Sequence, residues 1–131
     1  MWGEKMKIPY EHIDIEMRRL IYELNKLDCL YTIGCCIGHG VDLESDIILK
    51  VTNEELWNVI MLKLLRLNNK LKESNINIFK WHRLSLEDQL ITDWLIKIQV
   101  HPKNKENVEN EANRIQRIKK EAINNIINEI N

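Results

Sequence analysis

The chain has 131 residues, of which 44% are hydrophobic and 30% are charged, and its formal net charge at pH 7 is −1. This size favours one domain over residues 1–131, with a hydrophobic core of its own. The near-zero charge argues against binding of a long nucleic acid or an anionic membrane, so any anion site has to be local.

Two further features predict a protein of the reducing cytoplasm. The first ten residues lack the apolar region of a signal peptide, and no apolar run has the length of a membrane span. The three cysteines, of which Cys35 and Cys36 are adjacent, do not form the pattern of a disulfide framework. We therefore expect a cytoplasmic location and no membrane partner.

The first predicted element is a helix over residues 11–28. Its apolar residues recur at helical spacing, namely Ile13, Met17, Leu20, Ile21, Leu24 and Leu27. A strand over residues 30–35 follows, and a second strand over residues 46–51 is its expected neighbour. A glycine-rich loop over residues 34–40 and a short acidic spacer connect the two strands.

The second half begins with another predicted helix. Thr52 and Glu55 have the spacing of a capping box, which predicts a helix start there and an end near residue 72. Strands are predicted over residues 76–84 and 90–100, where isoleucines alternate with polar residues. Pro102 ends the second of these strands.

A long helix from about residue 105 to residue 130 closes the chain. Its apolar stripe consists of Val108, Ala112, Ile115, Ile118, Ala122, Ile126 and Ile130. A helix of roughly 26 residues is about 39 Å long, which is more than one small sheet covers. We therefore expect residues 104–131 to contact a second subunit of a homo-oligomer. The order of elements predicts an α+β fold with a mainly antiparallel four-stranded sheet packed against helices.

The loop over residues 34–40 is the most distinctive motif, because it holds three of the four glycines. Closely spaced glycines let the backbone turn sharply and approach a ligand. Successive amides around Gly38, His39 and Gly40 form a potential donor array for a phosphate or another anion. We therefore expect a ligand-binding site at Cys36, Gly38, His39 and Gly40.

Two other chemistries fit the same loop. Cys35 or Cys36 with His39 offers thiolate and imidazole ligands for zinc, and the other candidate ligands are Cys29, His12 and His82. However, the chain has neither a CxxC pair nor an HxxxH pair. In the second alternative Cys36 is a nucleophile activated by His39, but the spacing identifies no acidic group to orient the histidine. We expect binding rather than catalysis, and neither a metal nor a cofactor.

A second ligand-binding pattern lies in the strand predicted over residues 76–84. Phe79, Trp81 and Arg83 fall on one face of this strand, and Lys80 and His82 on the other. A tryptophan beside an arginine suits a base and its phosphate. The simpler interpretation is that both aromatic side chains pack in the core.

Arg114 and Arg117 lie one turn apart on the final helix and are candidates for clamping a second phosphate. The simpler interpretation is a solvated helix face. Trp57 and Trp94, in contrast, lie in apolar periodic segments, and we expect them to pack in the core.

The region up to Gly40 contains a helix, the pattern LN-x-L-x-x-L-Y-T-I and then CC-x-GHG, followed by the acidic spacer and an apolar strand. This arrangement resembles small proteins of bacteriophages and prophages in which a cysteine-rich GHG loop follows a short strand. More distantly, it is similar to wybutosine-synthesising proteins of the TYW-three type, which implies a link to methyl transfer on a transfer RNA base. Both resemblances rest on about the first 50 residues.

The phage resemblance implies an antidefence role in the cytoplasm of a bacterial host. In the version that we expect, the protein sequesters a small nucleotide-like anion, such as a cyclic immune signal, without turnover. Trp81 would stack on this ligand, and Arg83, Arg114 and Arg117 would neutralise its charge. The alternatives are a protein that docks on a host defence enzyme and a protein related to RNA modification.

Overall fold

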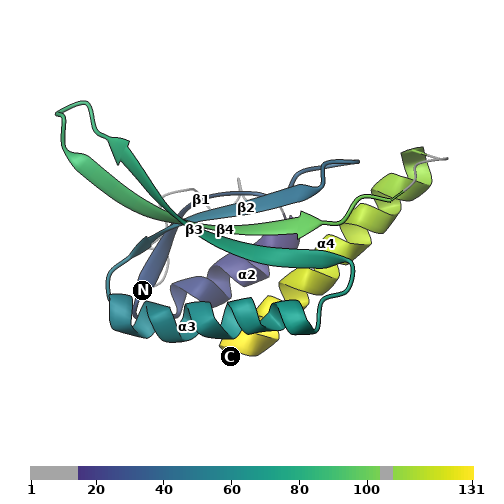
Figure 1. The fold of residues 1–131 in the computed structure, drawn as a ribbon, viewed down its shortest axis with the longest axis horizontal. Helices are drawn as coiled ribbons and strands as arrows, with labels where there is room; N and C mark the ends of the chain where they lie inside the picture. Colours follow the sequence, from purple (N-terminus) through teal and green to yellow (C-terminus); the bar gives the residue numbers. More distant parts are fainter. Residues whose placement is uncertain (1–14, 104–107) are drawn as a thin grey trace.

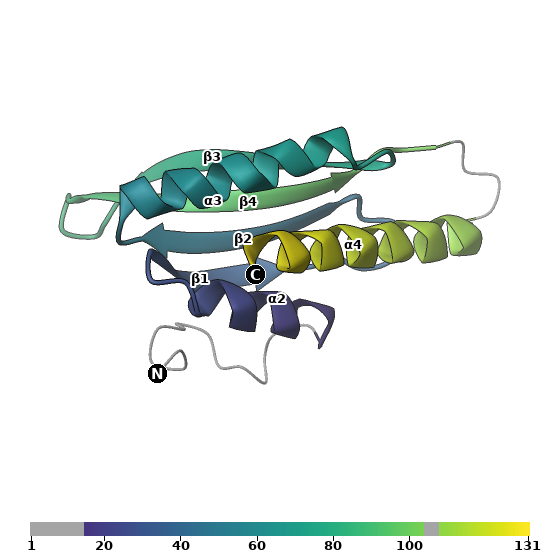
Figure 2. The same ribbon diagram turned by 90° about the horizontal axis from the view of Figure 1, so that it is seen from below.

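In the computed structural model, which describes residues 15–103 and 108–131, three helices cover one face of a four-stranded sheet (Figure 1 and Figure 2). The elements are α2 (Ile15–Asn25), β1 (Leu30–Cys36), β2 (Glu44–Val51), α3 (Glu54–Arg66), η2 (Leu67–Asn69), β3 (Ser74–Leu84), β4 (Leu90–Val100) and α4 (Val108–Ile130). The strands lie in the order β1-β2-β4-β3, and every neighbouring pair is antiparallel. The predicted α+β fold with a long C-terminal helix is confirmed.

The core lies between the sheet and the helices. Alternate strand residues such as Ile47, Ile96 and Ile98 point toward the helices and are almost completely buried. Trp57 of α3 meets Trp94 of β4 edge to face, with ring centroids 5.7 Å apart. The prediction that these two tryptophans pack in the core is confirmed.

Helix α4 is buried along most of its described length by the same chain. The predicted stripe residues from Ile115 to Ile130 are buried, and α2, α3, β3 and β4 all contact the helix. The length of α4 therefore does not by itself require a second subunit, because the sheet and two helices cover its apolar stripe. The homo-oligomer therefore stays a prediction, and the length of α4 no longer supports it.

Three predicted boundaries are wrong. The first helix ends at Asn25 and does not reach residue 28. The N-cap of α3 is Asn53, whose side chain accepts a hydrogen bond from the Leu56 amide, whereas Thr52 donates its hydroxyl to the Asp28 carbonyl oxygen. The helix also ends at Arg66 and continues as the short 3-10 turn η2, so it does not reach residue 72. The predicted starts of the first and last helices lie outside the described residues, and so do the two residues His12 and Ile13.

Candidate interaction surface

The glycine-rich loop is held against α4 by a buried lysine. Lys119 is fully buried, and its Nζ donates hydrogen bonds to the carbonyl oxygens of Ile37 (2.6 Å), Glu44 (2.9 Å) and Gly38 (3.3 Å). Burial lowers the pKa of Lys119, and nearby acidic groups, Asp42 first, act in the opposite direction. The carbonyl groups of the loop thus already surround a cation that belongs to the protein.

Two glycines of the loop adopt backbone conformations with positive φ where the loop contacts α4. Gly38 has a φ of 72°, and a Cβ at this position would lie 2.6 Å from the Glu44 carbonyl oxygen and 2.7 Å from Asp42 Oδ2. Gly40 has a φ of 60°, and its carbonyl oxygen accepts a hydrogen bond from Gln116. A carboxylate therefore lies beside Gly38, which disfavours a phosphate there. Exposed residues of the loop region include His39, Gly40 and Cys36.

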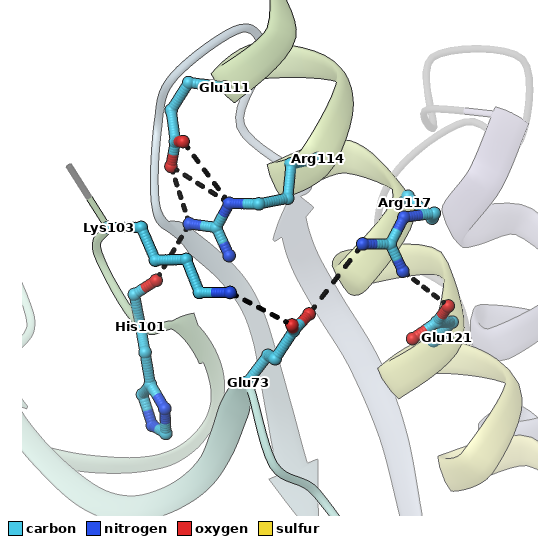
Figure 3. Close-up of polar contacts among 7 residues, drawn as sticks. All are labelled: Glu73, His101, Lys103, Glu111, Arg114, Arg117 and Glu121. Atoms are coloured by element: carbon cyan, nitrogen blue, oxygen red, sulfur yellow. Dashed lines mark hydrogen bonds and ion pairs between the residues drawn. The ribbon is translucent and has the colours of Figure 1, made fainter. Parts of the chain in front are cut away.

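The two arginines of α4 are each paired with a carboxylate (Figure 3). Arg114 Nη2 lies 2.6 Å from Glu111 Oε1 and also donates to the His101 carbonyl oxygen at 3.0 Å. The hydrogen bond with Glu111 raises the pKa of Arg114. Arg117 Nη1 donates to Glu121 at 2.9 Å, and its Nη2 lies 3.8 Å from Glu73. A phosphate would have to compete with these carboxylates for either guanidinium group.

The sheet has a second face, turned away from the helices, which we call the open face. Phe79, Trp81 and Arg83 of β3 lie on it as predicted, and both aromatic side chains are 47% exposed rather than buried in the core. The register places Phe79 beside Leu95, and Leu95 beside Ile48 of β2. An apolar row therefore crosses three strands of the open face.

A buried carboxylate anchors the open face near Trp81. Asp93, the cross-strand partner of Trp81, is 1% exposed and accepts from Lys50 Nζ and Arg83 Nε, each at 3.1 Å. Lys50 also donates to the Thr92 carbonyl oxygen. The depression at this point has a volume of about 420 Å³, and its lining includes Tyr31, Ile33, Lys50, Arg83, Ile91 and Asp93. Two cations and one carboxylate give the depression a local charge of +1.

The predicted site residues lie in three separate regions. The glycine-rich loop and the acidic spacer lead into Glu44, which pairs with Gln99 of β4, whereas Trp81 pairs with Asp93. Gln99 and Asp93 are six positions apart, which corresponds to about 20 Å along the strand. Arg114 and Arg117 lie on α4, on the other side of the sheet (Figure 1). Within the described residues, the loop, the strand face and the arginines do not form one pocket.

The β3–β4 hairpin projects beyond the remainder of the sheet (Figure 1). The pairing of β2 with β4 ends at Trp94, so residues 81–92 form a two-stranded extension, which we call the hairpin arm. Exposed leucines gather at its tip: Leu84 is 66%, Leu86 107% and Leu90 68% exposed. The Ser85 hydroxyl accepts from the Glu87 and Gln89 amides, and the Ser85 amide donates to the Gln89 carbonyl oxygen. The tip therefore has a defined turn although it lies far from the core.

The described residues were also considered as metal ligands and as membrane-spanning segments. Across residues 15–103 and 108–131, no three histidine, cysteine or acidic side chains gather as metal ligands would. The candidate ligand His12 lies outside these ranges. No helix in the described part of the chain combines the length and apolar character needed to cross a bilayer.

Comparison with protein families identifies the origin of the sequence. Residues 4–129 match the family of the YoqC prophage protein. The chain belongs to this family. Searches of curated proteins and of solved structures gave no match. The predicted resemblance to phage and prophage proteins is thus confirmed. The comparison shows neither a shared CC-x-GHG loop nor the similarity to wybutosine-synthesising proteins.

Two residues that the sequence patterns do not single out are important for this fold. Lys119 lies four residues after Ile115 and four before Ile123, on the buried stripe of α4, although it is charged. Asp93 is buried on the open face of the sheet. A charged residue at an apolar helical position is a signal that could have found Lys119, but only the tertiary structure shows why Asp93 is buried.

Proposed function

We propose that the protein is a non-catalytic interaction protein that docks on a protein of the bacterial host through its open face and hairpin arm. The observation that carries this proposal is the exposure of five large apolar side chains on one hairpin. Phe79 and Trp81 lie on the open face, Leu84 and Leu90 on the other face of the hairpin, and Leu86 in its turn. Large apolar patches on a protein surface usually mark sites of protein contact.

The composition of this surface supports protein docking. Aromatic side chains and arginine are enriched in the centres of protein interfaces, and Phe79, Trp81 and Arg83 lie together here. The hydrogen bonds at Ser85 hold the backbone of the tip in a defined turn, so less backbone entropy is lost when the tip binds. A projecting, ordered and apolar element is suited to insertion into a pocket of another protein.

The prophage family supports a host target for this docking. A protein made from a prophage meets the proteins of the bacterium that carries it, among them the defence enzymes. Inhibition of such an enzyme by docking is therefore the antidefence role that we favour. Sequestration of a nucleotide by one pocket receives less support, because Trp81 lies about 20 Å along the sheet from the loop region and the α4 arginines are paired with carboxylates.

A separate observation supports binding of a small nucleotide-like anion at one part of the predicted site, the depression beside Asp93. The depression beside Asp93 contains Lys50 and Arg83, and Trp81 lies next to it on the same face. Its volume of about 420 Å³ falls within the range of small-molecule sites. Native mass spectrometry with cyclic and linear nucleotides tests this candidate, and the adduct should disappear in the Arg83→Leu variant.

The experiment for protein docking compares three versions of the tagged protein. The Trp81→Ala/Leu86→Ala double variant removes the centre of the surface, and Leu62→Ala removes a half-exposed leucine of α3 on the helix side. Proteins captured from a host lysate are then tested individually with purified protein by hydrogen exchange. We expect a partner that protects residues 79–90, binds the Leu62→Ala variant normally and does not bind the double variant. A partner that binds all three versions equally would contradict the proposal.

A further inference from the structure

The outer edge of β3 is closed at one point by a side chain that imitates a neighbouring strand. The Ile76 amide donates to Asn68 Oδ1 at 2.7 Å, and Asn68 Nδ2 donates to the Ile76 carbonyl oxygen at 2.9 Å. An amide side chain thus makes the two hydrogen bonds that a strand residue would make. These bonds also show that both polar backbone groups of Ile76 point away from β4.

The outward orientation of the Ile76 backbone groups fixes the orientation of the backbone groups along the remainder of β3. Backbone groups in an antiparallel strand alternate, so the N–H and C=O groups of Ile78, Lys80, His82 and Leu84 also point outward. The hydrogen bond from the Ser85 amide to the Gln89 carbonyl oxygen agrees with this alternation, because it turns the odd-numbered residues toward β4. Strand β3 is at the end of the sheet order, so no strand among the described residues pairs with this edge.

The charged side chains along the β3 edge indicate which kind of strand could pair with it. Lys80, His82 and Arg83 are exposed within four consecutive residues. Lys80 has a long ion pair of 3.7 Å with Glu54, and Arg83 is paired with Asp93. A second copy of the chain that paired edge to edge here would still bring Lys80 and Arg83 close to their own copies, and like charges on paired strands are destabilising. An acidic strand would instead place carboxylates beside Lys80 and His82 and apolar side chains beside Phe79 and Trp81.

We propose that the β3 edge from Ile78 to Leu84 binds an extended acidic segment of the partner protein as a fifth strand of the sheet. Addition of a strand to an exposed sheet edge is an established mode of peptide recognition, in which the backbone provides affinity and alternate side chains provide specificity. This inference rests on the proposed docking function and names the partner segment: about seven residues in which acidic and apolar side chains alternate.

The first test measures amide hydrogen exchange of the isolated protein by nuclear magnetic resonance. The outward amides of Ile78, Lys80 and His82 should exchange at least about 10-fold faster than the amides of Phe79 and Trp81, which are bonded to β4. Equal protection of both sets would overturn the proposal, because it would mean that the edge is already paired.

The second test uses a labelled peptide of seven residues that alternates valine and glutamate. Binding should protect the amides of Lys80 and His82 and should be absent for a peptide that alternates valine and lysine. The same acidic peptide, N-methylated at the residues that face β3, keeps its charges but cannot donate to the edge. The proposal fails if the N-methylated peptide binds as well as its parent, or if neither acidic peptide binds.

A pair of variants separates strand pairing from side-chain docking. Lys80→Pro removes an outward N–H, and edge strands tolerate proline at such positions, whereas Lys80→Ala removes only the side chain. Lys80→Pro should bind the acidic peptide about 3- to 10-fold more weakly than Lys80→Ala, which is the expected effect of one hydrogen bond. His82→Pro replaces Lys80→Pro if the latter does not fold.

The same variants give different results for the proposed docking function and for the proposed strand addition. If a host partner is lost with the Trp81→Ala/Leu86→Ala variant but binds Lys80→Pro and Lys80→Ala equally, docking stands and strand addition is wrong. If the partner binds all of these variants as tightly as it binds the parent, both proposals are wrong. A dimer of the protein that disappears in Lys80→Pro would show self-pairing of the edge and would overturn the acidic partner.

Discussion

The two ends of the sheet are built in opposite ways. At one end, the glycine-rich loop is held on α4 by Lys119 and Gln116, and Gly38 packs closely against Glu44 and Asp42. At the other end, the hairpin arm extends away from the core, and its leucines face solvent (Figure 1). The first end satisfies its polar groups internally, whereas the second leaves apolar and backbone groups for another molecule.

This difference shows that the most unusual part of a sequence can have a structural explanation. The run of residues 34–40 is unusual because a tight loop on a buried lysine requires glycine at Gly38. The hairpin arm consists of ordinary strand residues, and its proposed docking role rests on their exposure. The predictions below test the comparison, beginning with the largest expected effect.

Replacement of Lys119 by methionine should loosen the loop end and leave the hairpin arm intact. The change removes the donor to three carbonyl groups, and we expect a loss of about 3 kcal/mol in the free energy of unfolding, since buried carbonyls without a partner are costly. Urea denaturation measures the change, and the exposed neighbour Lys120→Met is the control. A Lys119→Met protein as stable as its parent would show that the carbonyl contacts do not hold the loop.

The pair Gly38→Ala and Gly40→Ala separates packing from backbone conformation. Both glycines have positive φ, but only Gly38 has polar atoms within 3 Å of a Cβ position, while Gly40 has open space there. Gly40→Ala should cost about 1 kcal/mol for the left-handed conformation alone, and Gly38→Ala about 2 kcal/mol or more. Thermal unfolding of both variants gives the comparison. Equal costs would mean that the contacts of Gly38 relax without a penalty.

At the other end, Asp93→Asn should weaken the base of the hairpin arm. The amide keeps the size of the side chain but loses the charge that pairs with Lys50 and Arg83. Because both cations are partly exposed, we expect a modest loss of about 1 kcal/mol. Hydrogen exchange should also become faster in residues 81–92 but stay unchanged in the glycine-rich loop. Faster exchange in both regions would show that the two ends are coupled.

The sequence predicted the fold better than the site, for physical reasons. Apolar periodicity depends on local neighbours, so the strands and the buried stripe of α4 were found correctly. Whether one ligand can contact both the glycine-rich loop and Trp81 depends on which ends of the strands meet. The register places the β4 partner of Trp81 six residues from the partner of Glu44, where the loop region enters β2. The burial of Asp93 depends on Lys50, a residue 43 positions away.

The smallest predicted effect concerns the pH dependence of the loop end. Asp46 faces Cys36 across the β1–β2 pair, and its Oδ1 lies 3.9 Å from Lys97 Nζ, which is too far for a hydrogen bond. Burial raises the pKa of Asp46, the charge of Lys97 opposes this shift, and the charges of Glu44 and Asp42 add to it. The native state therefore holds the Asp46 proton more tightly than the unfolded chain does.

The sign of the effect follows from this difference. Stability from protonated Asp46 is fully present below the unfolded pKa of 3.8 and is lost as pH rises through the higher folded pKa. Asp46→Asn has no carboxyl group to ionise, so its stability relative to the parent should be greater at about pH 7 than at about pH 3. Urea denaturation of both proteins at the two pH values measures this gap. A gap that shrinks toward neutral pH would mean that Lys97 stabilises the ionised carboxylate more than burial destabilises it.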